Sequence, residues 1–329
     1  MTRRIGPFAV SPIGLGCMNL SHAYGAPPDA DTGARLLNAA LDLGYTHLDT
    51  AALYGFGANE TLLGNTLKSR RGDYMLASKC GIFRNAEGKR EIDGRPETIH
   101  QTCEDSLRRL QTDVIDLYYL HRWDKRVPIE ESVGTLAELV RAGKVRTIGL
   151  SEVSADTIRK AHEVHPVAAV QSEYSLWTRN PEIAVFDACR QLGIAFVAFS
   201  PVGRGFFGGE VRDGTFLEKD IRRGMPRFQG DNLAANLALL DGLRTVAREQ
   251  DCSMAQLALA WVLAQGDFIT AIPGTTRLDH LADNLSAGDI RLDEETQNRV
   301  AALFARDRVR GTRYNAATQA EIDTEEWLS

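Results

Sequence analysis

The chain has 329 residues, of which 43% are hydrophobic and 25% charged, and its formal net charge is −6. This composition excludes an intrinsically disordered chain, and no apolar run reaches the about 18 residues that a membrane-spanning helix needs. Acidic and basic residues are interleaved, so no basic stripe is available to bind a nucleic acid or an anionic membrane surface. We therefore expect a globular protein without nucleic-acid or membrane partners.

The first residues and the cysteines bear on the cellular compartment. The start MTRRIGPFAV carries two arginines without a following apolar stretch, which is not the pattern of a secretory signal. The five cysteines include no C-x-x-C pair and fit neither a disulfide framework nor a zinc site. His162 and His165 have the spacing of metal ligands but lack an obvious third ligand. We expect a cytoplasmic protein with reduced thiols and no metal.

Short β-branched runs alternate with longer amphipathic runs, which is the pattern of successive βα units. Strands are predicted at 13–16, 46–50, 75–79, 114–121, 147–150, 168–171, 194–200 and 269–272. Helices are predicted from Asp31, as N-cap, to 43, and at 96–110, 129–142, 155–164, 181–192, 254–265 and 278–285. Eight strands separated by helices predict an α/β fold, the TIM (β/α)8 barrel.

The chain is longer than a minimal barrel. Since no linker rich in glycine, serine or proline divides it, we expect one barrel domain over residues 1–329. Residues 201–232, rich in glycine and charge, form a long loop after the seventh strand, and an extra helix follows at 233–250. Loops of this length are usually functional, so we expect residues 201–232 to cover a bound cofactor. The tail beyond Leu292 adds a further helix and can cover a mouth of the barrel.

Four polar residues stand at the C-terminal ends of the second, third and fourth strands, where barrels build their active sites. Asp49 ends the second strand and is followed by Tyr54, Lys79 ends the third strand, and His121 ends the fourth. A buried aspartate and lysine are costly unless they pair with each other. One interpretation is structural, an ion pair beside a core tyrosine and histidine. The convergence of all four on consecutive strand ends favours a catalytic interpretation.

Proton transfer explains this set of residues. An ammonium beside a tyrosine favours the phenolate and lowers the tyrosine pKa, as Lys79 can do for Tyr54. Asp49 can hold Lys79 in its charged form, and His121 can donate a hydrogen bond to a substrate oxygen. The set is a proton donor for a carbonyl oxygen, and a reduction would also need a hydride carrier.

The later strand ends are suited to a cofactor. Ser151, Gln171 and Ser172 offer hydroxyl and amide groups for a carboxamide, and Phe199 offers a ring for stacking on a nicotinamide. The glycines of the segment 203–205 allow the backbone to approach a pyrophosphate. The run 274–276 leads into a helix whose N-terminus is a natural phosphate site.

Eight separated segments carry a resemblance to one family. In chain order they read GLGCMNLS, LDTAALYG, SKCG, IDLYYLHR, GLSE, QSEYSLWTR, AFSPVGRG and IPGTTRLDHLADN, and they span nearly the whole chain. The sequence resembles the aldo-keto reductase superfamily. The segments YSLWTR and SPVGRG are most similar to its branch that includes perakine reductase and bacterial relatives.

This resemblance implies a barrel that binds NADPH across its C-terminal mouth. It implies the catalytic tetrad Asp49, Tyr54, Lys79 and His121, with Tyr54 as general acid. For the cofactor it implies Gly16, Cys17, Met18, Asp49, Ser151, Gln171, Phe199, Ser200, Pro201, Val202, Gly203, Arg204, Gly205, Gly274, Thr275, Thr276, Arg277, His280, Asp283 and Asn284.

Three positions depart from the family pattern. Glu152 stands where the family usually has asparagine, and Phe199 stands where tyrosine or tryptophan is more frequent. His280 occupies a position that is arginine in many members. Arg277 is therefore the clearest partner for a 2′-phosphate and the main indication of a preference for NADPH over NADH.

The expected reaction is reversible reduction of an aldehyde or ketone to an alcohol by hydride transfer from NADPH. Two alternatives stay open: a Schiff-base lyase that uses Lys79, and a non-catalytic subunit that senses a nucleotide. Tyr24 and Trp123 are candidates for lining the substrate pocket, with Trp177, Phe206 and Phe207 as weaker ones. These rings favour an aromatic or otherwise apolar aldehyde. Oligomeric state stays open.

Overall fold

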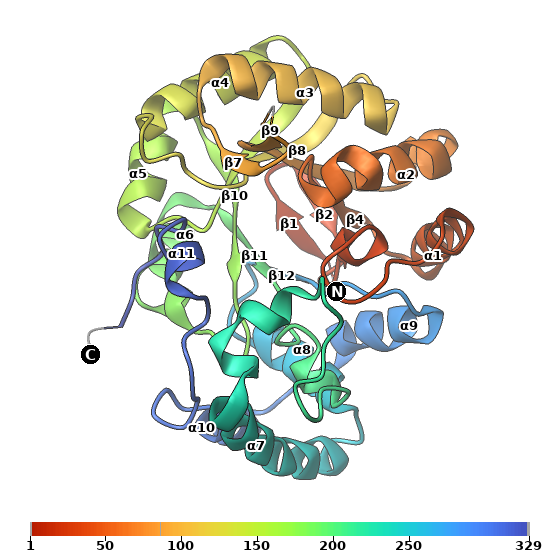
Figure 1. Cartoon of the computed structure of the whole chain (residues 1–329), viewed down its shortest axis with the longest axis vertical. Coiled ribbons are helices and arrows are strands. Elements are labelled where there is room, and N and C mark those ends of the chain that lie inside the picture. The colour runs from red at the N-terminus through yellow and green to blue at the C-terminus, as the bar shows by residue number, and fades with distance from the viewer. Residues whose placement is uncertain (1, 86, 328–329) are drawn as a thin grey trace.

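Eight parallel strands form the centre of the computed structural model, which describes residues 2–85 and 87–327 (Figure 1). In chain order they are β3 (Leu15–Gly16), β4 (His47–Asp49), β5 (Met75–Cys80), β8 (Ile115–Leu120), β9 (Val145–Ser151), β10 (Val167–Glu173), β11 (Ala195–Phe199) and β12 (Ile269–Ile272). Each pairs in parallel with the next. A parallel bridge between Ile13 and Ala271 closes the sheet. The predicted (β/α)8 barrel is confirmed.

Helices surround the barrel (Figure 1). Those that connect or follow its strands are α1 (Ala30–Leu43), α2 (Ala58–Leu67), α3 (Pro96–Leu110), α4 (Ile129–Arg141), α5 (Ala155–Val164), α6 (Val185–Leu192), α8 (Met254–Ala264) and α9 (Leu278–Ser286). The additional helices are α7 (Gly230–Glu249), α10 (Glu294–Leu303) and α11 (Ala316–Gln319). Among the described residues, no helix is both long and apolar enough to span a membrane.

Helices α1 and α2 differ from the sequence prediction for identifiable reasons. The N-cap of α1 is Asp29 rather than Asp31, because the Asp29 carboxylate accepts a hydrogen bond from the Thr32 N–H at 2.7 Å. Helix α2 was not predicted. Its polar residues Asn59 and Glu60 are fully buried, and this hides the alternation of apolar and polar faces that identifies the other helices.

A hairpin that was not predicted closes the N-terminal end of the barrel. It consists of β1 (Arg3–Ile5) and β2 (Phe8–Val10). Ile5 and Val10 are buried against the interior residues Met75, Leu117 and Val197. The N-terminal end of the barrel is therefore filled by apolar side chains, and ligands are left with the C-terminal end.

The segment 201–232 is anchored by aromatic residues. It forms short 3-10 turns, and Phe206 and Phe207 are fully buried beside Trp177. The Trp177 and Phe206 rings stack with centroids 4.3 Å apart. These three side chains, predicted weakly as substrate-lining, instead pack in the core, because the long loop needs apolar contacts to hold it on the barrel.

Candidate active site

The four residues predicted for proton transfer meet at the C-terminal end of the barrel. Asp49 ends β4, Lys79 lies in β5, His121 directly follows β8, and Tyr54 begins a 3-10 turn after β4. Lys79 Nζ donates hydrogen bonds to an Asp49 carboxylate oxygen, to the Thr50 carbonyl at 2.8 Å and to the Tyr54 hydroxyl at 3.4 Å. The rings of Tyr54 and His121 lie edge to face with centroids 5.9 Å apart. The structure thus brings the four side chains together.

A buried ion pair holds this cluster. Asp49 and Lys79 are each 1% exposed, and the second Asp49 oxygen accepts a hydrogen bond from Gln171 Nε2 at 2.7 Å. Burial opposes the charge of Lys79, but Asp49 and Tyr54 outweigh it and raise the Lys79 pKa. Lys79 is therefore an ammonium at neutral pH, and its three hydrogen-bond acceptors match its three protons.

The other two members of the cluster, Tyr54 and His121, are both uncharged at neutral pH. Burial raises the pKa of Tyr54, while the Lys79 ammonium lowers it. The predicted effect of Lys79 is present, but burial outweighs it and the hydroxyl keeps its proton. Burial lowers the pKa of His121 well below its ordinary value, and the Arg122 guanidinium lowers it further. His121 is therefore a neutral imidazole that donates from one ring nitrogen.

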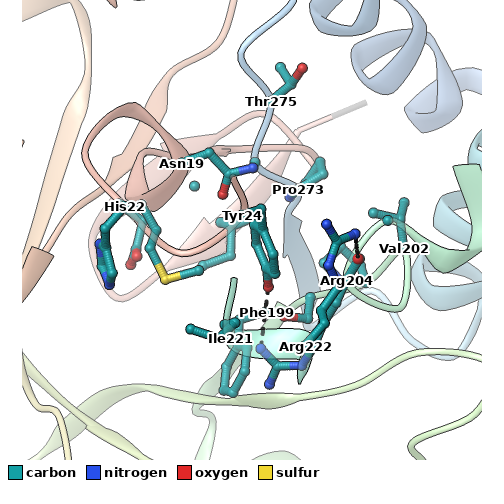
Figure 2. Close-up of a pocket in the computed structure, with 18 of the residues that line it drawn as sticks. Asn19, His22, Tyr24, Phe199, Val202, Arg204, Ile221, Arg222, Pro273 and Thr275 are labelled. Atoms are coloured by element: carbon teal, nitrogen blue, oxygen red, sulfur yellow. Dashed lines mark hydrogen bonds between the residues drawn. The ribbon is translucent and has the colours of Figure 1, made fainter. Parts of the chain in front are cut away.

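A cavity of about 730 Å³ lies beside the cluster. Asp49, Tyr54 and His121 are in its wall, and Lys79 lies behind them. Figure 2 shows the part of the wall formed by Tyr24, Phe199 and their neighbours. The predicted cofactor residues in the lining are Gly16, Met18, Asp49, Ser151, Gln171, Phe199, Ser200, Pro201, Val202, Arg204, Gly205, Gly274, Thr275, Thr276, Arg277, His280, Asp283 and Asn284.

Of the cofactor residues that the resemblance implies, two lie outside this lining. Cys17 is fully buried, and its N–H donates to the Asp49 carbonyl at 2.8 Å. The space beside Gly203 is taken by the rings of Phe207 and Trp177, which lie 2.8 and 3.1 Å from where a Cβ would stand. Both residues support the cavity wall without being part of it.

Two features at one end of the cavity fit a dinucleotide phosphate. A Cβ on Gly16 would lie 2.7 Å from the Ile272 carbonyl oxygen, and one on Gly274 would lie 2.9 Å from the Gly16 carbonyl oxygen. Only glycine at these positions lets the backbone after β3 and the backbone after β12 approach each other so closely. The N-cap residue of α9 makes no side-chain capping bond, and the N–H of His280 donates to Asp279 Oδ1 at 3.1 Å. The N–H groups of Leu278 and Asp279 have no acceptor among the described residues and are left for an anion. Arg277 stands directly before this helix, and its exposed guanidinium forms a surface ion pair with Asp279 at 2.5 Å, which is weak enough for a phosphate to compete with it.

Arg204, one of the predicted cofactor residues, has its charge neutralised by a neighbour. Its guanidinium is buried and pairs with Glu173 at 2.5 Å. It also donates to the hydroxyls of Tyr314 at 2.9 Å and Tyr24 at 3.3 Å, the second of which is drawn in Figure 2. The Arg204 side chain therefore links the loop after β11 to the strand ends, and only other parts of the residue are left for a phosphate.

The C-terminal tail joins the same charged cluster. Arg313 is 7% exposed, and its guanidinium donates to Glu152 and, at 3.1 Å, to Glu173. Glu152, which stands in place of the usual asparagine of the family, thus has a structural partner in the tail. Together with Arg204, these residues form a buried network that ties the tail to the ends of β9 and β10.

The predicted substrate residues differ in position. Tyr24 lines the cavity, whereas Trp123 does not, because its Nε1 donates to the Val127 carbonyl at 2.9 Å within its own loop. Sequence reasoning missed further lining residues, which come from loops and from the tail: Asn19, His22, Leu53, Arg90, Arg122, Ile221, Arg222, Met225, Tyr314, Asn315, Thr318 and Glu321. Most lie away from strand ends, so their position in the chain gives no signal. Arg122 is the exception, because it directly follows His121.

Comparison with known proteins agrees with this architecture. A sequence profile of the Aldo/keto reductase family matches residues 12–305. The chain is 44% identical over 308 residues to a protein of Glycine max named probable aldo-keto reductase 1, covering 93% of this chain and 89% of that one. It is 42% identical over 328 residues to an aldo-keto reductase of Schizosaccharomyces pombe, yakc, whose name specifies NADP(+), with 98% and 96% covered.

Solved structures of similar sequence share the fold. A glycerol dehydrogenase of Gluconobacter oxydans superposes with a TM-score of 0.85 at 32% identity, covering 93% of this chain and 95% of that one. An aldo/keto reductase of Klebsiella pneumoniae, in complex with NADP and acetate, superposes with a TM-score of 0.73 at 28% identity, with 95% and 98% covered. The narrower placement in the perakine reductase branch stays a prediction. By sequence and by structure, this chain belongs to the aldo-keto reductase family.

Proposed function

We propose that this enzyme reversibly reduces an aldehyde or ketone to an alcohol by hydride transfer from NADPH, with Tyr54 as general acid. The observation that carries the proposal is the contact of Lys79 Nζ with the Tyr54 hydroxyl at the cavity wall. NADP(+) in the name of the S. pombe relative and NADP in the Klebsiella structure support the cofactor.

Bound NADPH supplies the hydride, and the protein controls the proton. The Tyr54 hydroxyl, protonated at neutral pH, donates its proton to the carbonyl oxygen as negative charge develops there. The Lys79 ammonium stabilises the phenolate that is left, and Asp49 keeps Lys79 charged and in place. Neutral His121 lines the same part of the cavity and donates a hydrogen bond to the carbonyl oxygen, which orients the substrate.

The predicted cofactor residues divide along the cavity. Ser151 and Gln171 would hold the nicotinamide carboxamide. Because Gln171 Nε2 donates to Asp49, its carbonyl oxygen is the atom left to accept a hydrogen bond from the carboxamide amide group. Phe199 would stack against the nicotinamide ring, and the lining residues Ser200, Pro201, Val202, Arg204 and Gly205 would contact the pyrophosphate. The lining residues between Gly274 and Asn284 would hold the adenosine end, with Arg277 for the 2′-phosphate.

The lyase alternative is disfavoured by the state of Lys79. A Schiff base requires a neutral amine that reaches the substrate. Lys79 is a buried ammonium held by Asp49, Thr50 and Tyr54, and it lies outside the cavity lining.

Replacement of Tyr54 tests the proposal. Tyr54→Phe removes the proton donor and keeps the ring, so we expect kcat with NADPH and a panel of aldehydes to fall at least about a hundredfold. NADPH affinity, measured by fluorescence titration, should stay within about twofold. The matched control is Tyr118→Phe, because Tyr118 is buried in the core outside the barrel and is not in the cavity lining. Unchanged kcat in Tyr54→Phe would refute the role of Tyr54.

A further inference from the structure

The cavity contains one arginine whose charge is not balanced. Among the described residues, the arginines that line it are Arg90, Arg122, Arg204, Arg222 and Arg277. Four of them pair with a carboxylate, at distances between 2.5 and 2.7 Å. Within the described parts of the chain, Arg122 forms no ion pair with any aspartate or glutamate. Its positive charge is therefore available to a ligand.

The contacts of Arg122 fix its position and leave part of its guanidinium unused. Nη1 donates to the His121 carbonyl at 2.7 Å and to the Ser151 hydroxyl at 3.3 Å. Nε is buried and has no hydrogen-bond partner among the described residues. Both acceptors of Nη1 are neutral. A guanidinium has five N–H donors in a planar fork that matches a carboxylate, and most of those of Arg122 are still free.

This cation lies next to the reacting groups. Arg122 follows His121 directly in the chain, and Ser151 ends the neighbouring strand β9. After burial, Arg122 is the largest cause of the lowered pKa of His121, and it also acts to lower the pKa of Tyr54. Its field therefore reaches the place where the substrate carbonyl would lie. In a partly buried site such an interaction is weakly screened by solvent.

We propose that Arg122 binds an anionic group of the substrate, so that this enzyme prefers carbonyl compounds that carry a carboxylate. The inference rests on the proposed reductase function and narrows its substrate class. The cavity wall also includes the apolar residues Leu53, Ile221 and Met225. The substrate is thus an aldehyde or ketone with an apolar body and an acidic end, in place of the purely apolar aldehyde that the aromatic residues suggested.

Paired aldehydes test this inference. The probes are 3- and 4-carboxybenzaldehyde, each compared with the tolualdehyde of the same substitution, which has a methyl group in place of the carboxylate. We expect the wild-type enzyme to have the higher kcat/KM for at least one carboxylated member. Arg122→Met should lower that kcat/KM about ten- to hundredfold, which is the usual effect of losing a hydrogen bond to a charged group, and should change the tolualdehyde value much less.

Two further variants separate specific from general effects. Arg122→Lys keeps the charge without the planar fork and should retain part of the preference. Arg126→Met makes the same change of net charge in the same loop, at an exposed residue that pairs with Asp124 and lies outside the cavity lining. The ratio of the two kcat/KM values should be unchanged in Arg126→Met. NADPH affinity is measured for every variant.

The outcomes distinguish this inference from the function on which it rests. If the wild-type enzyme reduces neither member of any pair with NADPH, the proposed function fails. If it reduces both members equally well, or if Arg122→Met lowers both kcat/KM values by the same factor, the reductase stands and the role of Arg122 in substrate choice is overturned. Weakened NADPH binding with equal losses on both aldehydes would instead assign Arg122 to the cofactor.

Discussion

Removal of the arginine that the tail inserts between two buried carboxylates should destabilise the protein measurably. Arg313→Met keeps most of the side-chain volume but leaves Glu152, whose side chain is 0% exposed, without its cationic partner. Glu173 keeps Arg204, and Glu152 keeps a hydrogen bond from the Glu173 N–H at 2.8 Å, so only one charge becomes uncompensated. Breaking a buried pair costs about 3–5 kcal/mol, and we expect the lower end, about 3 kcal/mol.

The expected shift in melting temperature follows from the size of the chain. An unfolding entropy of about 2.1 cal/mol/K per residue gives about 0.7 kcal/mol/K for 329 residues. A loss of about 3 kcal/mol thus lowers Tm by about 4 °C. Differential scanning calorimetry measures this shift, and urea unfolding followed by tryptophan fluorescence measures the free energy of unfolding.

Two further variants identify the cause of that loss. Glu152→Gln combined with Arg313→Met removes the uncompensated charge and should regain at least about 1 kcal/mol over Arg313→Met alone. Arg310→Met, at an exposed residue of the same tail, should stay within about 0.5 kcal/mol of wild type. A double variant no more stable than Arg313→Met would refute the explanation by buried charge.

Two other predictions concern acid stability and cofactor choice. Burial raises the pKa of Glu173, but Arg204 and Arg313 outweigh it and bring the pKa to about 2. Because this folded-state pKa lies below that of the unfolded chain, the ionised Glu173 stabilises the protein above about pH 4.5, and this contribution of about 3 kcal/mol is lost as pH falls toward 2. In urea titrations from pH 5 to pH 2.5, the stability of Glu173→Gln should therefore fall less than that of wild type. Equal slopes of stability against pH would contradict the assignment. Arg277→Met should raise the Kd of NADPH about tenfold and leave that of NADH unchanged in fluorescence titrations, because only NADPH carries the 2′-phosphate; an equal loss for both cofactors would exclude this role.

The features visible in the sequence are those set by local patterns. The strands end within about two residues of their predicted ends, because most are short apolar runs with β-branched or aromatic residues. The cluster of Asp49, Lys79 and Tyr54 could also be predicted, since the carboxyl ends of neighbouring parallel strands converge. The position of Arg277 and of the start of α9 at the same end of the barrel could be predicted for the same reason.

What the sequence hid depends on contacts between distant segments. The pair of Arg313 and Glu152 joins residues that are 161 positions apart, and neither has a local pattern that indicates the other. The sequence shows that Glu152 departs from the family pattern, but it does not indicate that Arg313 is its partner. Helix α2 was not predicted because its polar residues Asn59 and Glu60 are buried, where they form hydrogen bonds with Thr50 and Ser78 respectively. Burial of polar groups at such positions is decided by tertiary structure.

The position of Arg313 in the chain also sets an order of events during synthesis. Glu152 and Glu173 leave the ribosome 161 and 140 residues before Arg313. At about 5–20 residues per second, the Glu152 carboxylate waits about 8–30 s for Arg313, whereas Glu173 can pair earlier with Arg204. Until Arg313 arrives, the charge of Glu152 is favourable only in water, so the end of β9 stays hydrated in the nascent chain. The mouth of the barrel is thus completed by a segment that is made after all eight of its strands, and a chain cut before Arg313 would lack part of the cavity wall.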